Sequence, residues 1–131
     1  MVYLKYYENE NKKYPYERNH TFSNFQTKAI TLSILYQEEI YGVKVMFSLP
    51  RGLGNAHYGK RIIKYNKYNP TSLLTIVHEV AHIIDEHNNG RFKGRKAHSS
   101  IHVRIVKKWI NICRKEMMIG SNDDWFLKVT Q

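Results

Sequence analysis

Two histidines with a glutamate between them form the clearest chemical pattern in the chain. His78 and His82 are four residues apart, and Glu79 follows the first of them directly. Residues four apart on a helix lie on one face, so both imidazoles can reach a single metal ion. Zinc suits imidazole ligands, and a catalytic zinc site keeps one position open for water. The pattern therefore predicts a zinc-activated water that attacks a peptide carbonyl while Glu79 takes its proton.

The residues around this motif favour a metal site over two solvated histidines on an amphipathic helix. Apolar residues dominate on both sides of it, from Leu73 to Ile84. A buried polar group needs a partner, and a metal ion supplies one partner for both imidazoles. We therefore expect a largely buried helix that begins near Asn69-Pro70-Thr71 and carries both ligands.

A third ligand must come from elsewhere in the chain. The extended pattern H-E-x-x-H-x-x-G-x-x-H is absent, because Asp85 and Asn88 occupy the positions of its glycine and its last histidine. The sequence offers few glutamates that could be a ligand from a later helix, because Glu116 is the only glutamate after Glu86.

Two later histidines are better candidates for the third ligand. His98 and His102 follow His82 after a loop long enough to return the chain to the metal. We predict His98, which stands at the start of the next helix, as the third ligand. His102 is the alternative ligand or a group that supports the site. The competing interpretation of His98 is a helix-capping or solvated histidine.

The remaining periodicities predict an α+β domain. Apolar residues spaced three and four positions apart predict a helix from Thr21, with Thr21 as N-cap, to about Gly42. A strand at 43–49 and a hairpin at 56–66 follow. The motif helix comes next, and a further helix runs from about Ser99 to Met118. The inward stripe expected for the first helix is Phe22, Phe25, Ala29, Leu32, Tyr36 and Ile40.

Part of this pattern resembles the SprT-like zinc metallopeptidases, the family that includes the Spartan-type DNA–protein crosslink proteases. The segments 54–58 and 61–66 are similar to the family's G-x-A-x-Y hairpin and following strand. The segment 69–82 resembles its metal helix, and 97–100 resembles the H-G-x-x-F segment that carries its third zinc histidine. The chain departs from the family at Ser99, in place of the glycine, and at His102, in place of the aromatic residue.

The resemblance implies a zincin-like minimal metallopeptidase domain: one helix, a small three-stranded sheet, the H-E-x-x-H helix and a further helix. It implies that His78, His82 and His98 bind Zn²⁺, that Glu79 is the general base, and that substrates are linked to DNA. Because the sequence has a single cysteine, Cys113, we expect no Cys-rich zinc ribbon as a DNA-binding accessory. DNA contacts would then come from the surface of the domain itself.

The charge of the chain agrees with a polyanionic partner. Twenty-one Lys+Arg against eleven Asp+Glu give a formal net charge of +10, and basic domains attract nucleic acid. Solvated surface lysines would give the same composition. The candidate DNA-contacting residues lie in the loop between the second and third ligands: Arg91, Lys93, Arg95 and Lys96. Four more come from the hairpin: Lys60, Arg61, Lys64 and Lys67.

Length and composition bound the remaining expectations. A chain of 131 residues fits a single domain over 1–131, with a tyrosine-rich N-terminal arm at 1–20. No apolar run is long enough for a membrane span or a signal peptide. One cysteine allows no internal disulfide, which favours the cytoplasm.

These observations predict a zinc-dependent metalloendopeptidase that cleaves proteins, in particular DNA-associated proteins. Two alternatives remain open. One is a nucleic-acid-binding module with a structural metal, which would have a fourth protein ligand in place of water. The other is a general processing peptidase with no link to DNA, which would show no salt-dependent DNA binding.

Overall fold

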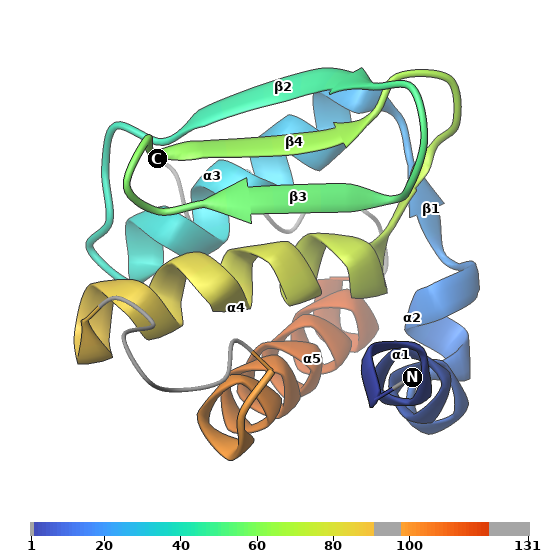
Figure 1. Cartoon of the computed structure of the whole chain (residues 1–131). Coiled ribbons are helices and arrows are strands. Elements are labelled where there is room, and N and C mark those ends of the chain that lie inside the picture. Colours follow the sequence, from blue (N-terminus) through green and yellow to red (C-terminus); the bar gives the residue numbers. More distant parts are fainter. Residues whose placement is uncertain (1, 91–97, 121–131) are drawn as a thin grey trace.

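The chain folds into a mixed α+β structure, seen in a computed structural model that describes the backbone of residues 2–90 and 98–120 (Figure 1). The predicted helix, three strands, helix and helix occur in that order, but two further helices precede them and two short strands lie before the first and second of the predicted helices. The elements are α1 (Val2–Lys13), α2 (Pro15–Asn19), β1 (Thr21–Phe22), α3 (Asn24–Gln37), β2 (Lys44–Leu49), β3 (Gly54–His57), β4 (Ile62–Asn66), β5 (Thr71–Ser72), α4 (Leu73–Asn89) and α5 (Ser100–Gly120).

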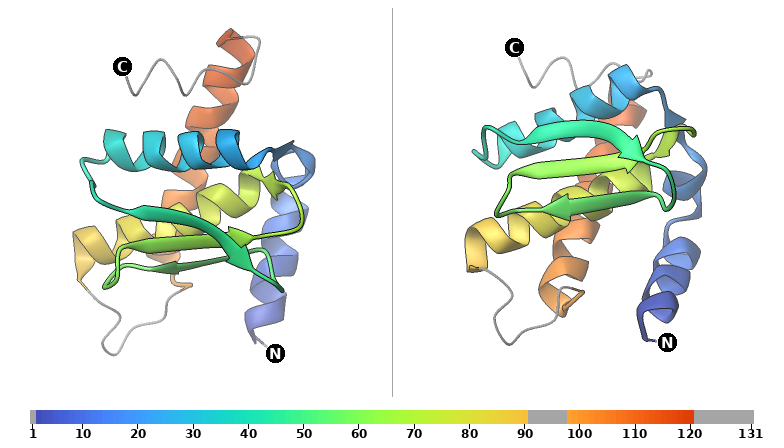
Figure 2. Two further views of the ribbon diagram at one scale, coloured as in Figure 1. Left: turned by 90° about the horizontal axis from the view of Figure 1, so that it is seen from above. Right: turned by 45° about the horizontal axis from the view of Figure 1, so that its top comes forward.

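The main sheet has the strand order β2-β4-β3, with β4 in the centre. The predicted hairpin is present, because β3 pairs antiparallel with β4, while β2 pairs with β4 in parallel. Helices α3 and α4 cover one face of this sheet, and α5 crosses α4 on the side away from it (Figures 1 and 2). A second, two-stranded sheet joins β1 to β5. It ties the segment before α3 to the start of α4.

Helix α3 buries a different stripe from the predicted one. Phe25 and Tyr36, which we expected inside, are 77% and 53% exposed. Thr27 and Thr31 are fully buried in the same helix. The Thr31 hydroxyl lies 2.7 Å from the Thr27 carbonyl and 2.8 Å from the hydroxyl of Tyr65. Because these hydrogen bonds satisfy the hydroxyl groups, threonine serves here as a core residue.

The ends of α3 also differ from the prediction. Ser23, not Thr21, is the N-cap, and it forms a capping box with Gln26. Thr21 is instead part of β1, where it pairs with Ser72. The helix ends at Gln37, five residues before Gly42, and its C-cap is Glu38.

Residues 1–20 were predicted as an arm, but residues 2–13 and 15–19 form helices α1 and α2. Glu17 in α2 is fully buried, and a buried carboxylate requires a partner. Arg114 of α5 supplies it, with Nε and Nη2 donating to the two carboxylate oxygens at 2.7 and 2.8 Å. The N-terminal helices are therefore fixed to α5.

Helix α4 is the central, largely buried helix that the sequence predicts. Its N-cap is Ser72, whose hydroxyl accepts a hydrogen bond from the backbone N–H of Thr75. Ile76, Val77 and Val80 are at most 1% exposed, and burial of such side chains contributes about 1.5–3 kcal/mol each. None of the helices in the described part of the chain is long and apolar enough to span a membrane.

Candidate metal centre

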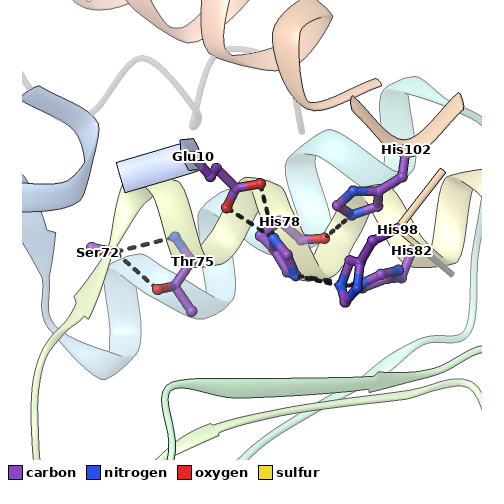
Figure 3. Close-up of polar contacts among 7 residues, drawn as sticks. All are labelled: Glu10, Ser72, Thr75, His78, His82, His98 and His102. Atoms are coloured by element: carbon purple, nitrogen blue, oxygen red, sulfur yellow. Dashed lines mark hydrogen bonds and ion pairs between the residues drawn. The ribbon is translucent and has the colours of Figure 1, made fainter. Parts of the chain in front are cut away.

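The motif residues lie in the middle of α4, and the start of α5 brings two more histidines to them (Figure 3). His78 and Glu79 are 2% and 5% exposed. His82 and His98 are half-buried, and His102 is fully buried. His98 and His102 both lie beside the motif histidines. All four histidines are thus brought together.

Three imidazole nitrogens form a tight triangle. The Nε2 atom of His82 lies 3.3 Å from Nε2 of His78 and 3.1 Å from Nε2 of His98. The third side, between His98 and His78, measures 3.3 Å. Nitrogens that bind one tetrahedral zinc at about 2.0–2.1 Å lie roughly 3.3 Å apart. The three side chains therefore match the spacing of ligands around a single zinc ion.

His102 is also close enough to hold a metal together with His78 and His82, since their ligand atoms lie within 4.8 Å of one another. Its Nε2 atom donates a hydrogen bond to the backbone carbonyl of His78 at 3.0 Å, so the lone pair of this ring is on Nδ1. Its ring also stacks on that of His82, with centroids 4.1 Å apart and an interplanar angle of 25°.

This stacking separates His102 from the triangle. A metal ion lies in the ring plane of each imidazole that binds it, and two stacked planes meet only far from both rings. The rings of His82 and His98, by contrast, are inclined by 60°, and those of His78 and His82 by 81°. The geometry favours His98 over His102 as the partner of the motif histidines.

The surroundings keep His82, His98 and His102 neutral, which is the form in which an imidazole binds a metal. Burial lowers the pKa of His82, and the neighbouring histidines lower it further. Burial likewise lowers the pKa of His98. The pKa of His102 falls to about 3, mainly through burial. Each neutral ring retains one nitrogen lone pair.

His78 has a partner that the sequence analysis did not identify. The carboxylate of Glu10, in α1, accepts a hydrogen bond from Nδ1 of His78, with oxygens at 2.9 and 3.1 Å (Figure 3). Burial alone would lower the pKa of His78, but this hydrogen bond and the charges of Glu79 and Glu10 raise it. With the proton held on Nδ1, the Nε2 lone pair points into the triangle. No local spacing could have revealed this contact, because the two residues are 68 positions apart.

Glu79 stands at the edge of a cavity of about 500 Å³ that it shares with His78. Burial raises the pKa of Glu79 to about 7, with His78 opposing the rise and Glu10 adding to it. A general base works best with a pKa near the working pH. The cavity is also lined by residues at the start of β3 and at the start of β5, in particular Leu53, Gly54, Pro70 and Thr71. It offers room for a substrate beside the carboxylate.

Gly54 leaves the space that Glu79 occupies. A Cβ atom at this position would lie 2.8 Å from Cγ and 3.0 Å from Oε2 of Glu79. We expect Gly54→Ala to displace the Glu79 carboxylate and to lower the rate of peptide hydrolysis by about 10–100-fold, the size of effect that small misplacements produce. Metal content should not change, because the triangle lies outside this contact. Metal analysis and a peptide assay would measure both.

Asn55→Ala is the matched control for this prediction. Asn55 is exposed and is the next residue in β3, where side chains alternate between the two faces. A Gly54→Ala variant as active as the Asn55→Ala variant would show that the position of Glu79 does not limit the reaction.

The candidate DNA-contacting residues are only partly within the described structure. Arg91, Lys93, Arg95 and Lys96 lie outside the described residues. In the hairpin, Lys60, Arg61 and Lys67 are exposed and Lys64 is half-buried. Nη1 of Arg61 donates to the backbone carbonyl of Tyr41.

A comparison of the chain with protein-family models, with curated proteins and with solved structures finds no match. The resemblance to SprT-like metallopeptidases therefore stays a prediction. The functional argument rests on the arrangement of the four histidines, Glu10 and Glu79.

Proposed function

We propose that the chain is a zinc-dependent metalloendopeptidase with a zincin-like, SprT-like core. His78, His82 and His98 hold the zinc ion, and Glu79 is the general base. One observation carries this proposal, namely the triangle of Nε2 atoms with sides of 3.1–3.3 Å. Hydrogen bonds between neutral imidazoles cannot account for all three sides, because at least one side then joins two lone pairs or two N–H groups, whereas one shared cation binds all three lone pairs.

A catalytic role is favoured over a structural one. A structural zinc site is closed by a fourth protein ligand, and a catalytic site is left open. His102 is the fourth histidine at the centre, but its ring stacks on that of His82, so the two ring planes do not converge on one nearby ion. The cavity lined by His78 and Glu79 adds space for a substrate. These features support three protein ligands and an open position.

The proposed reaction assigns distinct tasks to the protein groups. Bound zinc would lower the pKa of a water molecule and polarise the carbonyl of the substrate. Glu79 accepts the proton of the attacking water and passes it to the leaving nitrogen. In the described structure β3 pairs with β4 alone and forms an edge of the sheet. An extended substrate can add to this edge as a further strand and so be held beside Glu79.

Removal of the metal is the direct test. We expect the purified protein to bind one zinc ion and to cleave an unfolded protein substrate. A chelator should abolish cleavage, and added zinc should restore it. The melting temperature should fall with the chelator, because binding energy at such a site also stabilises the fold. A protein that binds no zinc, or that cleaves equally well after zinc removal, would contradict the proposal.

We further propose that the substrates are DNA-associated proteins. The net charge of +10 supports this. So does a row of exposed basic side chains along α5, formed by Arg104, Lys107 and Lys115. Because these positions are three and eight residues apart, they share one side of the helix.

DNA binding should weaken steeply as salt concentration rises, with little preference for sequence, because phosphate contacts release counterions. Replacing Arg91, Lys93, Arg95 and Lys96 together with neutral residues should flatten the salt slope and leave zinc content unchanged. The triple replacement of Arg104, Lys107 and Lys115 tests the α5 row in the same salt series. If the wild type binds no DNA at low salt, a general processing peptidase becomes the better description.

A further inference from the structure

The N-terminal helix α1 contributes one acidic side chain to the interior. Glu10 is 8% exposed and its partner His78 is 2% exposed. Both carboxylate oxygens lie within hydrogen-bond distance of the same nitrogen, Nδ1 of His78. A buried carboxylate is costly unless its charge is compensated, so this contact needs a reason beyond packing.

We propose that Glu10 is a positioning residue for the metal centre. Helix α1, which carries Glu10, therefore belongs to that centre. The inference rests on the proposed function, since it assigns His78 as a ligand. A carboxylate on the second nitrogen of a metal-binding histidine fixes the tautomer, holds the ring orientation and raises the basicity of the ligand. Glu10 meets these conditions at His78, because its oxygens lie at Nδ1 while Nε2 faces the other two histidines.

A second contact joins the N-terminal segment to the body of the protein, through α2. The buried Glu17 of α2 accepts two hydrogen bonds from the exposed Arg114 of α5. Helix α5 is also the element that follows His98 and carries His102. The ion pair thus anchors the N-terminal helices to the helix that is next to the third ligand. Glu10 and His98 approach the motif from two segments that are held together.

This arrangement gives a specific expectation for metal affinity. Loss of a carboxylate partner to a metal-binding histidine weakens metal binding by about 10–100-fold. Glu10→Ala removes both the charge and the acceptor, and should show this full loss. Glu10→Gln keeps an oxygen that can accept the hydrogen bond but removes the charge, and should lie between Glu10→Ala and the wild type.

Glu8→Gln is the matched control. Glu8 is exposed on the same helix, so the substitution removes the same charge without touching the centre. Zinc affinity would be measured by competition with a chromophoric chelator in the full chain. Visible absorption of the Co²⁺-loaded protein would report the ligand geometry, and the melting temperature with chelator would report the stability of the fold alone.

Weaker zinc binding by both Glu10 variants, with an altered Co²⁺ spectrum and unchanged melting in chelator, would support the inference. Wild-type affinity in both variants would overturn it. So would a loss of affinity confined to Glu10→Ala and matched by a lower melting temperature in chelator, because the role would then be structural. A wild-type protein that binds no metal would instead contradict the proposed function. Metal binding without peptide hydrolysis would remove the peptidase activity and leave the inference on Glu10 standing.

Discussion

Replacing Glu79 by glutamine is expected to lower the rate of peptide hydrolysis by about 10²–10⁴-fold, the usual contribution of a general base. Glutamine has the same shape, so it can occupy the space against Gly54. It cannot accept the proton of the water, and the loss should therefore fall on kcat. Zinc content should stay at the wild-type value, because the triangle is made by the three histidines. Steady-state kinetics and metal analysis of the same preparation would measure both effects.

Glu86→Gln provides the control, since it makes the same chemical change in the same helix two turns further on. It should hydrolyse the peptide at the wild-type rate. A fully active Glu79→Gln variant would contradict the role of Glu79 as general base. Loss of zinc in that variant would show that Glu79 is needed for zinc binding. The general base would then have to be another residue.

The second large effect is expected at the third ligand. His98→Ala should weaken zinc binding by more than about 100-fold, beyond the range found for groups that only support a ligand. Its Nε2 atom stands 3.1 Å and 3.3 Å from the other two, so the substitution opens one side of the triangle. His78→Ala and His82→Ala should abolish zinc binding. Competition with a chelator of known affinity would measure all three variants.

His102→Phe distinguishes the two candidates for that position. Phenylalanine keeps a ring that can stack on His82 and removes the hydrogen bond to the carbonyl of His78. We expect a loss of about 1 kcal/mol in stability, the usual net value of one hydrogen bond, and less than tenfold weaker zinc binding. If His102→Phe loses zinc while His98→Ala keeps it, the metal is held by His78, His82 and His102.

The motif helix was predictable because its signals are local. The spacing of His78 and His82 places both imidazoles on one face, and the apolar residues around them require a buried helix. The glycine and lysine of the turn at 59–60 and the strand residues on either side predict the hairpin of β3 and β4. These features depend on residues a few positions apart, whose relative placement follows from helix or strand geometry alone.

Helix α3 shows where local patterns mislead. The apolar spacing predicted Phe25 and Tyr36 inside, but the body of the protein packs on the side of Thr27 and Thr31. The Thr31 hydroxyl donates to the Thr27 carbonyl and accepts from the Tyr65 hydroxyl, and these hydrogen bonds offset the cost of burying that polar group. The partner that makes this possible comes from β4, so the sequence of α3 alone could not indicate it.

The sequence by itself determined the chemical groups of the candidate site: two histidines and a glutamate on one helix, with further histidines one loop away. Only the tertiary structure decided how they are used. The crossing of α4 and α5 sets the ring of His98 in the triangle and stacks the ring of His102 on His82. The docking of α1 brings Glu10 to His78, and the approach of β3 puts Gly54 against Glu79. The physical reason is that side-chain contacts between distant segments depend on how whole helices and strands pack, and that packing is set by the entire core.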